Sequence, residues 1–434
     1  MRKFSVKNSE NDTEDINLDI NNIWINNSKL TNVAGCFEGI YNVYCTGLTF
    51  HSNVHNINIC GLFGLSNGTN KSYKRIFINI DSIVPNIVSN NDARYSIPGT
   101  STIRGAFENR EVMLISSGNT SILSKLSSNC RQLFKGSTLF VDSSVTTFNL
   151  SNVITSCYEM FRSCTLYKYN NDPEYVYSDA DRYFVDIILP SACSEYYAMF
   201  YGSSILKNLP SLNSSSSGNL SYMYHSCIIN NSNVILPANY FDICRNNVSN
   251  TSYMFSENKY LRELEYSSSK GLLQDCVNLS NVTYMFNGTT SLHKGIPNNL
   301  FGTSETSQLT KLKSLEGMFK TSDVLYDIEN GSNKWMTEET LSPIVELTSI
   351  KEMFCNNRSN SATSAPGYSY TIKNVVKDSL NNDVYIISPT TFINHFIDNI
   401  SGLFKNSSVN IPFQFLGFIN GDEAFLDDSI TSID

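Results

Sequence analysis

The sequence predicts an α/β fold: a right-handed solenoid of about 12 irregular helix-plus-strand repeats. Two observations predict it. A short motif that ends in an aromatic residue recurs about every 32 residues, a period typical of stacked-repeat proteins. After each copy, a small-residue turn leads into a short apolar or alternating segment. Because one such unit is too small to bury its own apolar face, the units are expected to stack on their neighbours.

The motif places apolar residues four positions before the aromatic residue, one position before it, and at the aromatic itself. Val282, Met285 and Phe286 form one copy. The spacing i, i+3, i+4 is one face of a helix, so we predict one short helix in each repeat. The aromatic residues are Phe37, Phe63, Phe107, Phe134, Phe161, Phe200, Tyr224, Phe255, Phe286, Phe319, Phe354 and Phe404, with Phe425 as a degenerate last copy. We expect the Met and aromatic side chains to form a continuous internal ladder.

The residues after the aromatic predict a turn and then a strand. A glycine stands two positions on in several copies, for example Gly136 and Gly288, where a helix C-cap needs a positive φ. Tyr260–Tyr266 then alternates between apolar and polar residues, as a short strand does. Proline ends several of these segments, as at Leu236-Pro237. Short parallel strands are therefore expected along one face and helices along the other.

The repeats divide the chain into two regions. Residues 1–30 are a polar N-terminal arm or cap, in which Trp24 and Ile25 are candidates to seal the first repeat, and residues 31–434 are the repeat solenoid. Uneven spacing predicts loop insertions on one face, because extra residues there leave the stack intact. The longest gaps contain Val84–Thr102, Lys168–Tyr183 and Asn356–Tyr370.

The motif resembles that of the BspA-like leucine-rich repeat proteins, in the sub-type whose repeats read Met-Phe-x-Gly-Cys-x-x-Leu. The copies nearest to it begin at Met199-Phe200 and Met285-Phe286, and the match extends from about Thr31 to the end of the chain. The resemblance implies a leucine-rich-repeat-like solenoid with no enzyme activity. It also implies an adhesion or surface-recognition role, and similar arrays occur in phage virion proteins.

Composition excludes several classes of function. The net charge of −9, with no cluster of Lys and Arg, argues against nucleic acid as a partner. No run approaches the roughly 20 apolar residues of a membrane-spanning helix, so we expect no membrane insertion. Met1–Ile20 lacks the apolar middle region of an export signal. We therefore expect the 11 cysteines to be free thiols. Several of them, including Cys130 and Cys157, fall on core positions of the repeat.

Motifs for catalysis or metal binding are not apparent. His51 and His55 have a ligand-like spacing, but zinc needs three or four ligands and no cysteine pair lies nearby in the sequence. The acidic segments Asp172–Glu174 and Asp179–Asp181 could offer oxygen ligands to calcium, but they lack the glycine of the known calcium loop and suit a solvated insertion. We predict no enzyme activity, no cofactor and no bound metal.

The strongest candidates for partner binding are aromatic residues on two of the insertions. Tyr175, Tyr177 and Tyr183 share one insertion, and Tyr368 and Tyr370 share another. Tyrosines on loops are common binding anchors, because they are amphipathic and lose little side-chain entropy. The alternative is that each insertion simply packs on its own repeat.

Two settings compete for such a protein. The first is a structural component of a phage virion, in the tail or an appendage, that contacts other subunits or a host-surface receptor and is assembled in the host cytoplasm. The missing export signal and the reduced thiols favour it. The alternative is a BspA-like adhesin on a bacterial cell surface. Assembly into a symmetric homo-oligomer is left open, and so is the identity of the partner.

Overall fold

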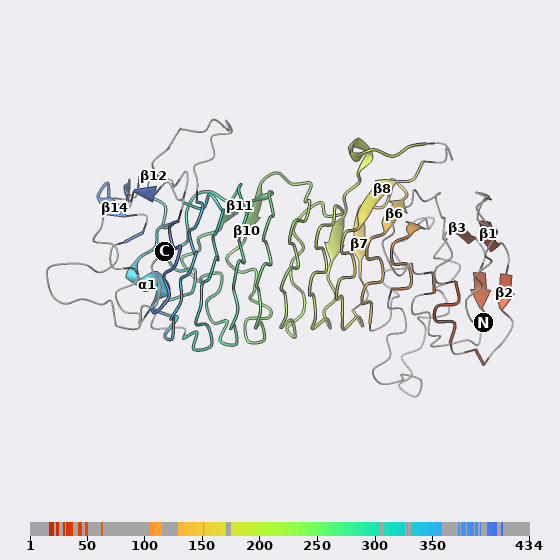
Figure 1. Ribbon diagram of the computed structural model, residues 1–434, viewed down its shortest axis with the longest axis horizontal. Coiled ribbons are helices and arrows are strands. Elements are labelled where there is room, and N and C mark those ends of the chain that lie inside the picture. Colours follow the sequence, from red (N-terminus) through yellow and green to blue (C-terminus); the bar gives the residue numbers. More distant parts are fainter. Residues whose placement is uncertain are drawn as a thin grey trace. The chain divides into compact units, whose positions relative to one another are not determined.

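The computed structural model is a β-solenoid that forms two compact units, residues 1–213 and 214–434 (Figure 1). The structure describes residues 17–20, 23–25, 29–30, 32–37, 42–45, 48–50, 62–63, 105–114, 129–150, 152–170, 175–303, 308–325, 328, 331–357, 372–373, 375–378, 380–385, 387–388, 391, 397–405 and 409–410. Within each unit, successive coils of the chain lie side by side and bond to each other through their backbones.

Short strands of unit 1 pair in parallel from coil to coil. Its strands are β1 (Asn17–Ile20), β2 (Ile23–Ile25), β3 (Asn42–Cys45), β4 (Leu48–Phe50), β5 (Glu111–Met113), β6 (Thr138–Val141), β7 (Thr147–Asn149), β8 (Thr165–Lys168) and β9 (Asp186–Ile188). The pairs are β1 with β3, β2 with β4, β7 with β9, and the three-stranded order β5-β6-β8. Equivalent residues face each other, as Leu139 and Leu166 do. The predicted parallel pairing is therefore confirmed in these sheets.

Unit 2 follows the same plan with fewer regular strands. Its elements are β10 (Val234–Leu236), β11 (Leu261–Leu264), α1 (Glu338–Leu341), β12 (Ile372–Lys373), β13 (Val375–Lys377), β14 (Asp383–Tyr385) and β15 (Val409–Asn410). The β10–β11 and β12–β15 pairs are parallel, whereas β13 and β14 form an antiparallel pair. β11 confirms the strand predicted within Tyr260–Tyr266.

The predicted helices are absent from the described copies of the motif. In the part of the chain that the structure describes, the only α-helix is the four-residue α1, and it is not at a motif. The prediction of an α/β, leucine-rich-repeat-like solenoid of about 12 helix-plus-strand repeats is therefore wrong. The structure is built almost entirely of strands, turns and extended segments.

Each motif instead forms a ribbon of consecutive tight turns, which residues 130–137 illustrate. The Gln132 N–H donates to the carbonyl of Tyr158 in the next coil at 2.8 Å, and the Phe134 N–H donates to that of Met160 at 3.0 Å. The intervening Leu133 N–H turns back to the carbonyl of Cys130 at 3.2 Å. Alternate N–H groups therefore bond within the coil and to its neighbour.

A left-handed backbone conformation makes this alternation possible. The residue two positions before the aromatic has a positive φ in every copy where both residues are described, for example 57° at Gln132 and 51° at Glu159. Most residues two positions after the aromatic share it, as Gly136 does with 69°. A positive φ at the third residue of a turn is the mark of a type II turn and cannot occur within a helix. Residues at i, i+3 and i+4 therefore point inward from a ribbon of turns, just as they would from a helix.

The motif aromatics stack in a column inside each unit. In unit 1 the ring centroids of Phe134 and Phe161 are 5.6 Å apart, and those of Phe161 and Phe200 are 5.8 Å apart. In unit 2 Phe286 lies 5.7 Å from Phe255 and 5.4 Å from Phe319. The planes of these six rings differ by no more than 14° between stacked neighbours. The predicted internal ladder is confirmed within each unit.

Asparagine or serine stands five positions before the aromatic in most of the described ribbons. The Asn250 side-chain oxygen accepts a hydrogen bond from the Ser252 N–H at 2.9 Å, and Asn281 accepts one from Thr283 at 3.0 Å. This is an Asx turn, in which a side chain mimics a backbone turn. Equivalent bonds are made by Asn32, Asn129, Asn219, Ser314, Ser349 and Asn399. The abundance of uncharged polar residues therefore has a structural cause.

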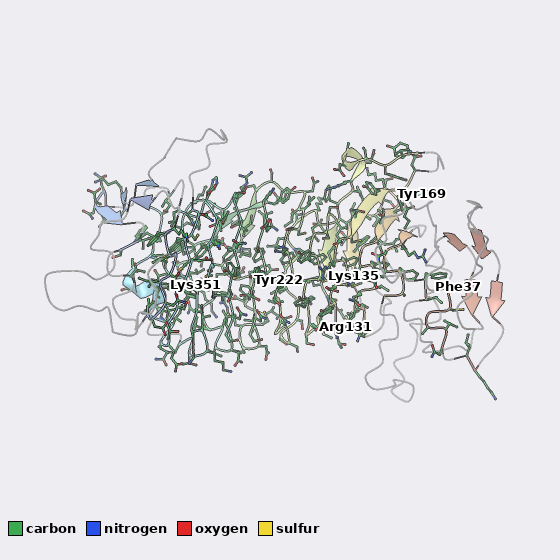
Figure 2. All side chains as sticks on the ribbon, viewed as in Figure 1. Phe37, Arg131, Lys135, Tyr169, Tyr222 and Lys351 are labelled. Carbon is green, nitrogen blue, oxygen red and sulfur yellow. The ribbon has the colours of Figure 1, made fainter. Side chains whose placement is uncertain are left out.

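Partly exposed charged side chains of neighbouring ribbons pair with each other, and Arg131 and Lys135 are two of them (Figure 2). The Lys135 ammonium is 3.0 Å from the carboxylate of Glu159, which also pairs with Arg162. Burial raises the pKa of Glu159, but its hydrogen bonds from Gln132, Lys135 and Arg162 outweigh burial and lower it. The carboxylate therefore stays ionised and links adjacent coils.

A row of tyrosines lies at the positive-φ position in unit 2. Tyr253 stacks on Tyr222 at 4.7 Å and on Tyr284 at 5.1 Å between ring centroids. The Tyr284 hydroxyl then reaches Glu352, two coils further on, at 3.2 Å. The Tyr284 ring passes over Gly317, where an added Cβ would lie 2.2 Å from the ring. Gly317 therefore provides both a positive φ and the space for the ring.

Phe286→Ala is expected to lower the free energy of unfolding by about 3–5 kcal/mol, as for other fully buried phenylalanines. Phe286 is completely buried between two stacked rings, and its removal leaves a cavity. Urea unfolding followed by circular dichroism measures the change. Leu380→Ala is the control, because Leu380 is 79% exposed. If both variants unfolded at the same urea concentration, the idea that the column of rings stabilises unit 2 would be contradicted.

Gly317→Ala is expected to cost about 1–2 kcal/mol for the positive φ alone, and more because the Tyr284 ring must move. The same substitution in a Tyr284→Ala background retains only the backbone part of the cost. A double-mutant cycle by urea unfolding measures the difference. Strictly additive effects would show that the ring does not need the space above Gly317.

Candidate functional site

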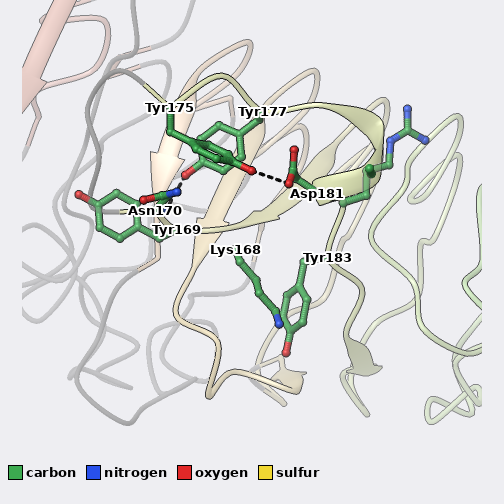
Figure 3. A pocket seen from close by; sticks show the side chains of 9 residues that line it. Lys168, Tyr169, Asn170, Tyr175, Tyr177, Asp181 and Tyr183 are labelled. Atoms are coloured by element: carbon green, nitrogen blue, oxygen red, sulfur yellow. Dashed lines mark hydrogen bonds between the residues drawn. The ribbon is translucent and has the colours of Figure 1, made fainter.

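The insertion between β8 and β9 borders an open pocket of about 560 Å³ in unit 1 (Figure 3). Four tyrosines line it, namely Tyr169, Tyr175, Tyr177 and Tyr183. The remaining wall includes the polar side chains of Lys168, Asn170, Asp181 and Arg182. The pocket is therefore aromatic and polar at once.

Backbone hydrogen bonds attach both arms of the insertion to the solenoid. On the outgoing arm, the Tyr169 N–H donates to the carbonyl of Val141 at 2.8 Å, which continues the β6–β8 pairing. On the returning arm, the Tyr183 N–H donates to the carbonyl of Leu166 at 2.8 Å. The short 3₁₀-helix η5 (Asp179–Asp181) precedes this return. The pocket walls are therefore fixed to the end of β8.

Tyr177 packs the insertion onto the sheet. Its ring centroid is 4.9 Å from that of Phe140 and 5.0 Å from that of Tyr167. Its hydroxyl accepts a hydrogen bond from the Asn170 N–H at 2.7 Å. Tyr175 meets the Tyr177 ring edge-on at 5.0 Å. Tyr177 therefore packs the loop on its own repeat, as the alternative interpretation expected. Tyr175 in turn packs against Tyr177.

Tyr183 closes the opposite side of the pocket. Its hydroxyl donates to the carbonyl of Val145 at 2.8 Å, which fixes the ring against unit 1. The Lys168 ammonium lies 5.0 Å from the centre of the same ring, and Figure 3 shows the two side chains together. A cation over a tyrosine face is held by the ring quadrupole. Lys168 is therefore positioned without an acidic partner in the pocket wall.

Asp181 carries the negative charge of the pocket. One carboxylate oxygen accepts a hydrogen bond from the Tyr175 hydroxyl at 2.6 Å, and the other accepts from the Ser178 N–H and hydroxyl at 2.8 and 2.7 Å. The Tyr175 bond, followed by those from Ser178, lowers the pKa of Asp181. Its hydrogen bond to Asp181 raises the pKa of Tyr175. At neutral pH the site therefore presents a carboxylate beside a neutral phenol.

Arg182 contributes little net charge to the pocket. Its guanidinium donates to the Asp179 carboxylate at 2.7 Å, three residues earlier in the chain. Asp179 is the more exposed member of this ion pair. Asp179 compensates the charge of Arg182 close to the pocket wall. The two remaining charges of the wall are the Lys168 ammonium and the Asp181 carboxylate, which have opposite signs.

The structure brings together three of the five residues predicted for partner binding. Tyr175, Tyr177 and Tyr183 line one pocket, while Tyr368 and Tyr370 lie outside the described residues. The sequence interpretation missed Lys168, Tyr169, Asn170 and Arg182, and it treated Asp181 as part of a solvated acidic loop. The available signal was the pair Tyr169-Asn170 at the start of the insertion, since residues on loops that a scaffold positions commonly line sites.

The described wall of the pocket contains no histidine and no cysteine. In the described part of the chain, no group of three or more His, Cys, Asp and Glu side chains could hold a metal ion. The nine cysteines whose side chains are described are free thiols. Cys130 and Cys157 are fully buried, which confirms that they fill the core. His51 and His55 lie outside the described residues. None of the described helices is long and apolar enough to cross a membrane.

Comparison with known proteins gives one match. Residues 190–298 match a family model described as "Mycoplasma protein of unknown function, DUF285". Neither the curated proteins nor the solved structures contain a match to this chain. The chain is thus a solenoid-like repeat protein with a segment similar to DUF285, and the match assigns no biochemical activity to it.

Tyr175→Phe is expected to raise the pKa of Asp181 toward its ordinary value, because the largest stabilisation of the carboxylate is removed. In the unmodified protein the hydrogen bond survives as the pH falls until the lowered pKa of Asp181 is reached. Carbon-13 NMR of the aspartate carboxyl groups measures this titration. Tyr183→Phe is the matched control, since that hydroxyl bonds to Val145. An Asp181 titration that Tyr175→Phe leaves unchanged would contradict the assigned bond.

Proposed function

We propose that this chain is a non-catalytic interaction protein that uses the β8–β9 insertion of unit 1 to contact the surface of a partner. The observation that carries the proposal is a tyrosine-lined pocket held on a rigid stack of coils. Sites on loops that a rigid scaffold positions are the usual place for recognition. The repeat architecture alone would not support this step, because a fold does not determine a function.

The described part of the insertion also presents an apolar side chain to solvent. Val176, between two pocket tyrosines, is 83% exposed, and Ala180 is exposed as well. Aromatic and apolar anchors surrounded by polar groups are typical of the centre of a protein interface. Burial of Val176 and Tyr175 against a partner would remove this apolar surface from water.

The proposed setting is the surface of a bacterial cell, where the protein acts as an adhesin. The match to a family described from Mycoplasma supports this setting. A phage virion component is the second candidate, and the free thiols favour it, because virions assemble in a reducing cytoplasm. Mass spectrometry of washed cell-surface fractions beside purified virus particles separates the two. Peptides at constant stoichiometry in particles would replace the adhesin proposal with the virion proposal.

The double variant Tyr175→Ser/Val176→Ser is expected to reduce attachment about tenfold, as loss of an interface anchor does. The assay counts the beads, coated with the full chain, that attach to cultured host cells. The host is that of the organism that makes the protein. Leu380→Ser is the matched control, because Leu380 is 79% exposed and lies in unit 2. Equal attachment by the double variant and the control, with both folded, would contradict a role of the insertion in binding.

A further inference from the structure

We infer that the tyrosine pocket of unit 1 binds an uncharged saccharide, a mono- or disaccharide unit of a cell-surface glycan. The inference rests on the proposed function, since it names the ligand of the same insertion. It follows from three properties of the wall: exposed ring surface, hydrogen-bonding groups of both kinds, and balanced charge. The volume of about 560 Å³ lies within the roughly 300–1,000 Å³ range of small-ligand sites.

The rings provide the apolar part of such a site. Tyr169 and Tyr175 are half-buried at the pocket wall, so part of each side chain stays accessible. A pyranose ring has a face of C–H groups and a rim of hydroxyls. A tyrosine offers a complementary apolar body with a polar end. A site of this kind therefore suits an amphipathic sugar ring better than a purely apolar ligand.

The polar groups match the hydroxyl rim, which both donates and accepts hydrogen bonds. Asp181 supplies an ionised acceptor and Lys168 supplies a donor. The Asn170 side-chain amide has both functions. Hydrogen bonds to charged groups are stronger than those between neutral groups, so a hydroxyl that contacts Asp181 would be held firmly. A site built to bond hydroxyls rejects analogues that lack them.

The charge of the wall argues against a phosphorylated or nucleotide ligand. Arg182 is paired with Asp179, and the Lys168 ammonium lies over the Tyr183 ring. An anion in the pocket would face the Asp181 carboxylate, which Tyr175 and Ser178 keep ionised. Phosphate sites instead gather several donors and cations of one sign. A neutral ligand avoids that repulsion.

Saturation-transfer NMR and calorimetry of the full chain test the inference, with N-acetyllactosamine and mannobiose as neutral probes and glucose 6-phosphate as the anionic one. We expect at least one neutral probe to bind, and glucose 6-phosphate to bind more weakly. Tyr175→Ala and Asp181→Asn should each weaken the neutral probe about tenfold or more. Tyr266→Ala, a half-buried tyrosine of unit 2, is the matched control and should bind as the unmodified chain does.

The variants must first match the unmodified chain in their thermal unfolding. Binding by neither neutral probe, binding that survives both pocket variants, or tighter binding of glucose 6-phosphate would overturn the inference. Attachment to host cells gives a separate readout. Undiminished attachment after glycosidase treatment of the cells would show a protein ligand, which keeps the proposed function and overturns the saccharide. Saccharide binding with no attachment to cells would support the inference and contradict the proposed function.

Discussion

The alternation of the backbone between right-handed and left-handed conformations is the constraint on which the solenoid depends. Only when the residue two positions before the aromatic has a positive φ does every second N–H point toward the next coil. A non-glycine residue in this conformation costs roughly 1–2 kcal/mol. The hydrogen bonds between coils and the stacking of buried rings offset that cost. The backbone ladder therefore sets the ring spacing, and the ring column in turn holds the coils together.

How much of this the sequence could predict depends on the element. The repeats, the parallel strands and the aromatic column followed from spacing alone, since those features require only residues at fixed positions. The prediction of a helix in each repeat was wrong, because both a helix and a ribbon of turns place residues such as Val282, Met285 and Phe286 inward. Glycine at the positive-φ position, as at Gly317 and Gly402, was the distinguishing signal, because glycine is unfavourable within a helix.

The site was only partly predictable for a different reason. Tyr175, Tyr177 and Tyr183 stood out as aromatics on an insertion, a property that is local in sequence. The pocket depends on the chain returning to the sheet after the insertion. There Arg182 forms an antiparallel β-bridge with Tyr167, and Asp181 comes to lie beside Tyr175. No periodic pattern encodes that return. The sequence therefore identified the rings but not the charges between them.

The attachment of the insertion explains why a repeat fold suits recognition. Extra residues in a surface loop cost little closure entropy, so a coil can carry an insertion without losing its place in the stack. Here both arms also bond to the sheet, and Tyr177 packs against Phe140. The described arms of the loop are thus held in place before a ligand arrives, and binding does not have to order them. The backbone ladder that stacks the coils is consequently also what gives the pocket its fixed shape.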